Sequence, residues 1–137
     1  MKLKIDTIII EGVDKTGKDI LADYISLLSN YRYSVKARGV ISQSVYEILF
    51  NRKQYERECD DHTLYVLLDA DIEDLNVRFE ITNEPDIDIE QHLDAFREAF
   101  NTMTIGKYNL MFNSSLMTPY KIAKAILEYV DELNGIE

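Results

Sequence analysis

The stretch EGVDKTGKDIL, Glu11 to Leu21, joins an apolar run to an amphipathic one. Residues 12–18 within it fit the pattern G-x-x-x-x-G-K, whose glycines let the backbone curl so that successive N–H groups face phosphate oxygens. Residues 4–10 end in three isoleucines and predict a buried strand, and residues 18–30 repeat apolar side chains on one helix face. Strand, loop and helix in this order are the context that a phosphate-binding loop requires.

The candidate phosphate-binding residues follow from that pattern. Lys18 is the candidate catalytic residue, because it would reach the β- and γ-phosphates of a bound nucleotide at the positive end of the helix dipole. The competing interpretation is a glycine turn that binds nothing. The predicted binding set is Gly12, Asp14, Lys15, Thr16, Gly17, Lys18 and Asp19.

Asp19 departs from the usual pattern. A serine or threonine normally follows the lysine of such loops, and its hydroxyl ligates magnesium without adding charge. Here a carboxylate stands at that position, close to where the phosphates would lie. Two interpretations stay open. Either Asp19 is a magnesium ligand, directly or through water, or it is an N-terminal helix residue that suits the helix dipole after catalysis has been lost.

Length and composition predict one globular domain over residues 1–137, with 46% hydrophobic residues. No apolar stretch approaches the roughly 20 residues of a membrane span, and the apolar run near the start is too short for a signal peptide. The single cysteine, Cys59, cannot form an internal disulfide. We therefore expect a cytoplasmic protein with no membrane partner.

Charge is distributed unevenly along the chain. Counting Lys and Arg against Asp and Glu, residues 1–55 carry 9 and 6, residues 56–98 carry 3 and 15, and residues 99–137 carry 3 and 4. The loop thus lies in the one segment with a basic excess, which favours phosphate binding. The acidic centre argues against direct binding of nucleic acid. It is either a solvated face or a docking surface for a basic partner.

Apolar patterns predict strands that alternate with helices. Such alternation predicts βαβ units, and therefore an α/β, three-layer P-loop fold with a small parallel sheet of about four strands and helices on both faces. Pro85 interrupts the pattern, and Thr118-Pro119 is typical of a helix start. Strands are expected over residues 4–10, Tyr33–Arg38, Leu64–Asp69 and Tyr108–Phe112, and helices over residues 18–30, from Val45 toward Arg52, over Ile72–Phe79, over Ile89–Met103 and after Thr118.

The wider stretch IIIEGVDKTGKDILADYI, residues 8–25, resembles the thymidylate kinases, whose loops read E-G-x-D-x-x-G-K followed by a hydroxyl residue. LYVLLDADIEDLNVRFE, residues 64–80, resembles the fourth strand of that family and the helix that leads to its lid. TPYKIAKAILEYV, residues 118–130, resembles its closing helix. The resemblance implies a deoxynucleoside monophosphate kinase that uses ATP and Mg²⁺. It also implies that Asp14 holds the acceptor sugar or an arginine, and that Arg38 binds the acceptor phosphate.

The chain departs from this family between Arg38 and Leu64. Family members place a helix, a strand ending in Asp-Arg and a further helix there, whereas only about 25 residues intervene here and Gly39-Val40 replaces a Glu-Pro-Gly motif. We therefore predict that the third strand is deleted. Deletion of an interior strand would leave unpaired edges beside the central strand, to be covered by rearrangement or by another chain. Arg78 is either a lid residue or a surface helix residue.

Two functions are compatible with these residues. The first is transfer of the γ-phosphoryl group of ATP, with Mg²⁺, to a deoxynucleoside monophosphate. The second is a catalytically degenerate relative that binds a nucleotide, or only a protein partner, and no longer transfers phosphate. A homodimer is also expected from the predicted sheet edges. The composition, rich in Ile, Asn and Tyr, gives the impression of a phage-encoded protein.

Overall fold

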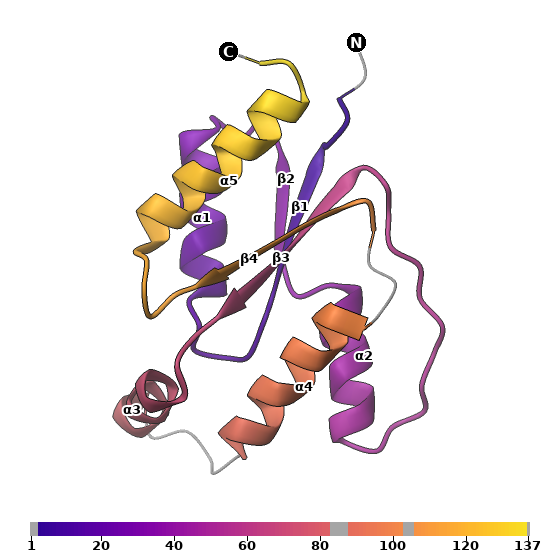
Figure 1. The fold of residues 1–137 in the computed structure, drawn as a ribbon, viewed down its shortest axis with the longest axis vertical. Helices are drawn as coiled ribbons and strands as arrows, with labels where there is room; N and C mark the ends of the chain where they lie inside the picture. Colours follow the sequence, from indigo (N-terminus) through magenta and orange to yellow (C-terminus); the bar gives the residue numbers. More distant parts are fainter. Residues whose placement is uncertain (1–2, 83–87, 103–105, 137) are drawn as a thin grey trace.

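The computed structural model describes residues 3–82, 88–102 and 106–136. Its sheet consists of four parallel strands in the order β2-β1-β3-β4, which confirms the predicted α/β class (Figure 1). The strands are β1 (Thr7–Glu11), β2 (Ser34–Ala37), β3 (Thr63–Asp69) and β4 (Tyr108–Asn113). The helices within the described residues are α1 (Lys18–Leu28), α2 (Val40–Leu49), α3 (Ile72–Thr82), α4 (Ile89–Thr102) and α5 (Pro119–Leu133).

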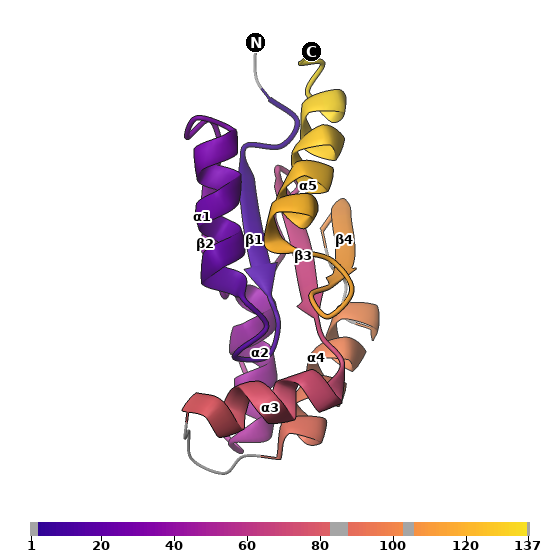
Figure 2. The same ribbon diagram turned by 90° about the vertical axis from the view of Figure 1, so that its left-hand side faces the viewer.

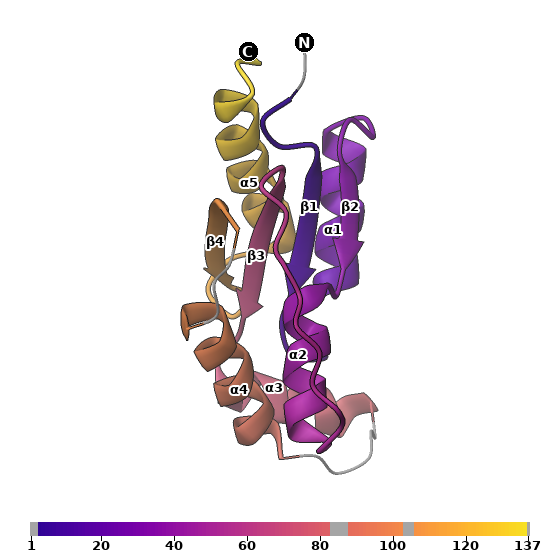
Figure 3. The ribbon, with the colours of Figure 1, turned by 90° about the vertical axis from the view of Figure 1, so that its right-hand side faces the viewer.

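Helices cover both faces of the sheet, as predicted. One core forms where α1 and α5 pack on the sheet, and a second core forms on the opposite face beneath α2 and α4 (Figure 3). The side chains of β3 alternate between the two cores: Leu64 and Val66 enter the first, and Tyr65 and Leu67 enter the second. Because both faces are covered, β3 is buried along nearly its whole length.

The central strand β1 is paired on both sides. Ile8 lies opposite Val35 of β2 and opposite Leu64 of β3. Of the two predicted ways to cover the edge beside this strand, rearrangement within the chain is the one observed, because β2 pairs directly with β1. Residues 50–62, which form no helix or strand, return the chain from the end of α2 to the start of β3 (Figure 3). An open central edge thus gives no argument for self-association.

The helix starts agree with the sequence patterns except at α2, while α1 ends at Leu28, before residue 30, and α3 continues to Thr82. Helix α2 begins at Val40, earlier than the predicted start at Val45, and ends at Leu49. The closing helix begins as predicted, with the Thr118 hydroxyl accepting a hydrogen bond from the Lys121 amide at 3.3 Å. Pro85 and Met103 lie outside the described residues. No helix among the described residues is long and apolar enough to cross a membrane.

A buried asparagine joins the two ends of the described chain. The Ile5 amide donates to the Asn134 Oδ1 at 3.0 Å, and the Asn134 Nδ2 donates to the Ile5 carbonyl at 2.9 Å. Both ends lie on the same side of the molecule, opposite the helices α3 and α4 (Figure 1). The candidate loop lies at the other end of β1, and the clasp is therefore remote from it.

Candidate functional site

The glycine-rich loop follows β1 at the carboxyl end of the sheet, and α3 crosses this end of the molecule (Figure 2). Gly12 adopts a φ of 149°, and a Cβ atom there would lie 2.4 Å from the Leu68 carbonyl oxygen on β3. Only glycine fits such a position. Gly17 caps α1 with a φ of 97°, and a Cβ atom there would meet nothing within 4 Å. The loop is thus packed against the sheet at Gly12 and open at Gly17.

The predicted catalytic residue, Lys18, is buried in the loop, with 3% of its surface exposed. Its Nζ donates hydrogen bonds to the carbonyl oxygens of Gly12 at 2.8 Å and Val13 at 2.7 Å. Burial, and then repulsion from Arg38, lowers the pKa of Lys18 from 10.5 to about 8. The ammonium group therefore lies across the loop on neutral acceptors, which anionic phosphate oxygens can replace.

The remaining loop groups fit an anion. The loop backbone leads directly into α1, whose N-cap, Gly17, makes no side-chain capping hydrogen bond. The Thr16 hydroxyl is buried and donates to the Val13 carbonyl at 2.8 Å, so it stabilises the loop itself. Backbone amides at the N-terminus of a helix are the donors that bind phosphate in loops of this kind.

A cavity of about 310 Å³ opens beside the loop. Its walls come from the loop, from the first turn of α1, from the residue after β2 and from α3. Five of the seven predicted loop residues line it, and so does the predicted acceptor arginine. The lining residues are Asp14, Lys15, Gly17, Lys18, Asp19, Ile20, Arg38 and Phe79.

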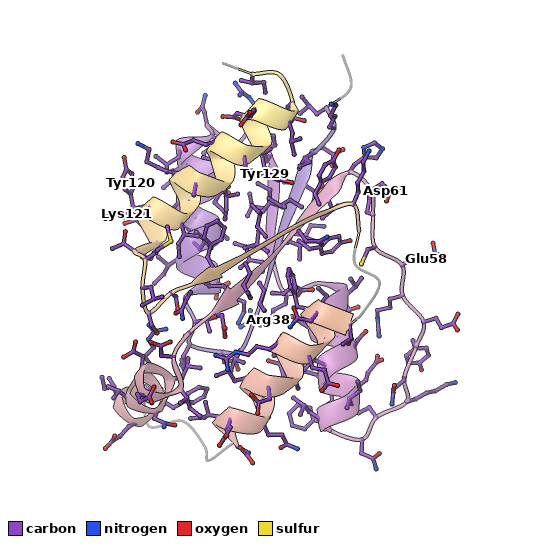
Figure 4. All side chains as sticks on the ribbon, in the orientation of Figure 1. Arg38, Glu58, Asp61, Tyr120, Lys121 and Tyr129 are labelled. Carbon is purple, nitrogen blue, oxygen red and sulfur yellow. The ribbon has the colours of Figure 1, made fainter. Side chains whose placement is uncertain are left out.

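Asp14 links the two principal cations of this cavity. Its Oδ1 accepts a hydrogen bond from the Arg38 Nη2 at 3.2 Å and lies 3.9 Å from the Lys18 Nζ. The Arg38 Nη1 lies 3.9 Å from the Asp19 Oδ1. Arg38 directly follows β2, and Figure 4 shows it at the carboxyl end of the sheet, away from the acidic side chains Glu58 and Asp61. Strands β1 and β2 thus bring the donor and acceptor cations predicted from the sequence to one cavity.

Asp19 lies in the first turn of α1, with 78% of its side chain exposed. Its contact with Arg38 is loose, so its carboxylate oxygens stay accessible from the cavity. Oxygen ligands suit magnesium, and magnesium at a nucleotide site needs only one or two protein carboxylates beside phosphate oxygens and water. The donor set therefore fits the ion. No group of three or more His, Cys, Asp or Glu residues within the described ranges could hold a metal ion without such help.

Arg78, the candidate lid residue, lies on α3 and contacts the loop. Its Nη1 donates to the Lys15 carbonyl at 2.8 Å and to the Ser114 hydroxyl at 3.3 Å. Arg97, the other arginine of this half of the chain, binds Asp69 at the end of β3 at 2.9 Å and the Ala70 carbonyl at 3.2 Å. Arg78 is therefore at the site, whereas Arg97 holds the end of β3.

Sequence reasoning missed two lining residues, Ile20 and Phe79, and it also missed Glu11, which binds the residue after Arg38. Phe79 lines the cavity from α3, but in the sequence it counts only as one apolar position of a helical pattern. Glu11 is completely buried at the end of β1, and its carboxylate accepts hydrogen bonds from the start of α2. The sequence does contain a signal for Glu11. A carboxylate at the end of an apolar strand is expected to be buried, and a buried charge needs hydrogen-bonding partners.

The chain matches no protein-family model and no curated protein sequence. Among solved structures it is similar to the YorR protein from Bacillus subtilis in complex with phosphorylated GDP, with a TM-score of 0.74 and 18% sequence identity. The similarity covers 91% of this chain and 95% of that chain. It shows the fold. The four-stranded parallel sheet with the glycine-rich loop after β1 is therefore a P-loop type of α/β fold.

Proposed function

We propose that this protein binds ATP on residues 12–18 and transfers its γ-phosphoryl group to a deoxynucleoside monophosphate. One observation carries the proposal: Lys18 and Arg38, which follow different strands, line the same cavity and share the Asp14 carboxylate. A kinase of this class needs one cation for the donor phosphates and one for the acceptor phosphate. The loop motif supports the donor role for Lys18, and the sequence resemblance to thymidylate kinases supports the acceptor role for Arg38.

Each residue has a defined part in the transfer. Lys18 exchanges the Gly12 and Val13 carbonyls for phosphate oxygens of the donor, and amides of the loop and of the first turn of α1 bind the same group. Arg38 exchanges Asp14 for the acceptor phosphate, and its planar guanidinium suits a bidentate contact. A phosphate acceptor is already anionic, so the transfer requires little help from a general base.

Magnesium is the cofactor of the proposed reaction. Asp19 would hold it, directly or through water, next to the loop. When bound there, the ion would neutralise charge on the phosphates and so favour transfer. Arg78 of α3 reaches the loop at the Lys15 carbonyl, to which its Nη1 donates a hydrogen bond. We propose that it also contacts the donor phosphates, as a lid arginine does.

The similarity to a structure that holds a guanine nucleotide supports nucleotides as the ligand class. It does not favour one base, because the residues that would contact a base differ between proteins of the same fold. The cavity offers Ile20 and Phe79 as apolar contacts beside the phosphate-binding groups. The acceptor base is therefore to be found by assay.

A second candidate is nucleotide binding without transfer. It is favoured by the two carboxylates, Asp14 and Asp19, that surround Arg38 and would repel phosphates. In this case the protein would act as a nucleotide sensor, or dock on a protein partner or a second copy of itself. Exposed acidic residues of the segment 56–98, such as Glu56, Glu58, Asp60 and Asp61, would then face a basic partner.

One assay separates the two functions. Wild type and Lys18→Ala are incubated with ATP, Mg²⁺ and each of the four common deoxynucleoside monophosphates, and formation of diphosphate and ADP is measured. Transfer by wild type that Lys18→Ala abolishes supports the kinase. ATP binding without transfer to any acceptor supports the second candidate, and equal ATP affinity in both proteins contradicts both.

A further inference from the structure

Glu11 ends β1, the strand that leads into the phosphate-binding loop, and its carboxylate accepts hydrogen bonds from Gly39, Ile41 and Ser42. It is completely buried and binds the first residues of α2. Its Oε1 accepts from the Gly39 amide at 2.6 Å and from the Ser42 hydroxyl at 2.6 Å, and its Oε2 accepts from the Ile41 amide at 2.7 Å. The Ser42 amide adds two longer contacts of 3.4 Å.

These contacts replace a local helix cap. The residue before α2 is Gly39, and no side-chain cap of its own satisfies the first amides of the helix. Glu11 supplies the missing acceptor from another strand, and its negative charge suits the positive end of the helix. Gly39 permits this approach, because a Cβ atom there would lie 2.7 Å from the Ile9 Cγ2. A buried carboxylate that accepts this many hydrogen bonds holds the donor groups around it in fixed positions.

The backbone on both sides of the Arg38 Cα atom is hydrogen-bonded to β1. The Arg38 amide donates to the Ile10 carbonyl at 2.8 Å, and the next amide, that of Gly39, donates to Glu11. Arg38 adopts a φ of 69°, a left-handed conformation that costs a non-glycine residue energy and persists only when neighbouring contacts enforce it. From this backbone its guanidinium reaches Asp14 in the cavity.

We infer that Glu11 is a positioning residue for Arg38. Through Glu11, the strand that leads into the phosphate-binding loop also fixes the position of the acceptor arginine. This inference rests on the proposed function, in which Arg38 binds the acceptor phosphate. Glu11 touches no substrate. It fixes the backbone on the carboxyl side of Arg38, so that the guanidinium is held ready beside the loop before the acceptor arrives.

The inference predicts a selective effect on the two ligands. Glu11→Gln places an amide NH₂ group against backbone N–H donors, so at least one of the hydrogen bonds to Gly39 or Ile41 is lost. We expect the dissociation constant for the accepted deoxynucleoside monophosphate to rise about tenfold, while that for ATP changes less than twofold. Ser42→Ala removes only the hydroxyl donor and should show the same selectivity with a smaller effect, which keeps the test available if Glu11→Gln folds poorly.

Glu47→Gln is the matched control. Glu47 lies near the other end of the same helix, where it binds Arg57 and the Tyr55 amide and has no contact with Arg38 among the described residues. Its substitution should lower stability without changing the ratio of the two dissociation constants. If Glu11→Gln and Glu47→Gln shift both ligands alike, Glu11 only stabilises α2 and the inference is wrong.

A double-mutant cycle with Arg38→Ala tests the route of the effect. In the Arg38→Ala background, Glu11→Gln should no longer weaken monophosphate binding, because its effect passes through Arg38. An undiminished effect there contradicts the inference and leaves the proposed function intact. If Arg38→Ala binds each monophosphate as well as wild type does, the acceptor role of Arg38 fails, and the inference fails with it.

Discussion

The Arg38 guanidinium and the Asp14 carboxylate are 3.2 Å apart, and they come from segments that follow different strands of the sheet. Both side chains are about half exposed, at 47% and 50%. Pairs this exposed contribute little to folding, typically 0 to about 1 kcal/mol. The contact is therefore better understood as an arrangement for binding than as a source of stability.

Arg38→Ala should accordingly weaken binding of the acceptor monophosphate at least tenfold and shift the midpoint of thermal unfolding by only a few degrees. Arg38→Lys should recover little, because an ammonium group cannot make the bidentate contact. Asp14→Asn should weaken monophosphate binding less, by about threefold, since it removes the partner of Arg38 but leaves the guanidinium in place. Calorimetry measures the affinity for the monophosphate, and thermal unfolding measures the stability. A large loss of stability in Arg38→Ala would show that the pair is structural.

The lowered pKa of Lys18 gives the affinity for ATP a dependence on pH. With a pKa of about 8, Lys18 loses its proton in the free protein as the pH rises from 7 to 9.5, and the neutral amine binds phosphate poorly. The affinity should therefore fall above pH 8, by up to about tenfold per pH unit. Lys18→Arg, which stays charged over this range, should show a flatter profile in the same titration calorimetry. Parallel profiles would exclude Lys18 as the titrating group.

Asp19 should matter for the magnesium-dependent step and not for folding. Asp19→Ala removes the proposed metal ligand, so we expect phosphoryl transfer to fall tenfold or more while the unfolding midpoint stays nearly unchanged. Asp19→Thr restores a neutral ligand and should retain most of the transfer. The rates are compared over a series of Mg²⁺ concentrations. Unchanged transfer in Asp19→Ala would assign Asp19 to the helix start alone.

If wild type shows no transfer, Asp19→Thr becomes a test of the second candidate, nucleotide binding without transfer. Asp19→Thr should then bind the magnesium complex of ATP more tightly, because repulsion near the phosphates is removed, without creating turnover. Turnover gained by this variant would mean that Asp19 is what suppresses catalysis.

Gly12→Ala should destabilise the protein by about 2–4 kcal/mol, because the added Cβ atom lies 2.4 Å from a backbone carbonyl of β3 and the φ is unfavourable. Gly135→Ala is the control, since its φ of 70° is also left-handed but a Cβ atom there meets nothing within 4 Å. We expect about 1 kcal/mol for that variant. Urea unfolding measures both, and similar costs would mean that the contact with Leu68 relaxes easily.

The sequence patterns predicted those parts of the fold whose causes are local. The loop between β1 and α1 and the start of α5 at Thr118 were predicted because each depends on neighbouring residues. The start of α2 was placed too late because its cap, Glu11, is far away in the sequence. The sequence left open whether β2 or another chain covers the edge of β1, since the pairing of β1 with β2 depends on the absence of a strand and not on any residue present.

The same distinction holds for the site. Lys18 and Arg38 were predicted from a motif and a resemblance, and the structure brings them to one cavity. The contact between Arg78 and the Lys15 carbonyl was not predicted, because it joins α3 to the loop across the fold. A backbone carbonyl can accept a hydrogen bond whatever its residue type. Contacts of this kind are therefore found only in the three-dimensional structure.

The Asn134 clasp holds the backbone of Ile5 within hydrogen-bonding distance of the residue that follows α5. A short peptide could therefore join the two ends, and new ends could be opened within residues 50–62, which form no helix or strand. Such a circular permutant would begin at β3 and keep the loop, Arg38 and Glu11 on one uninterrupted segment. The phosphate-binding half of the molecule would then be made last during synthesis, after the strand against which Gly12 packs is already in place.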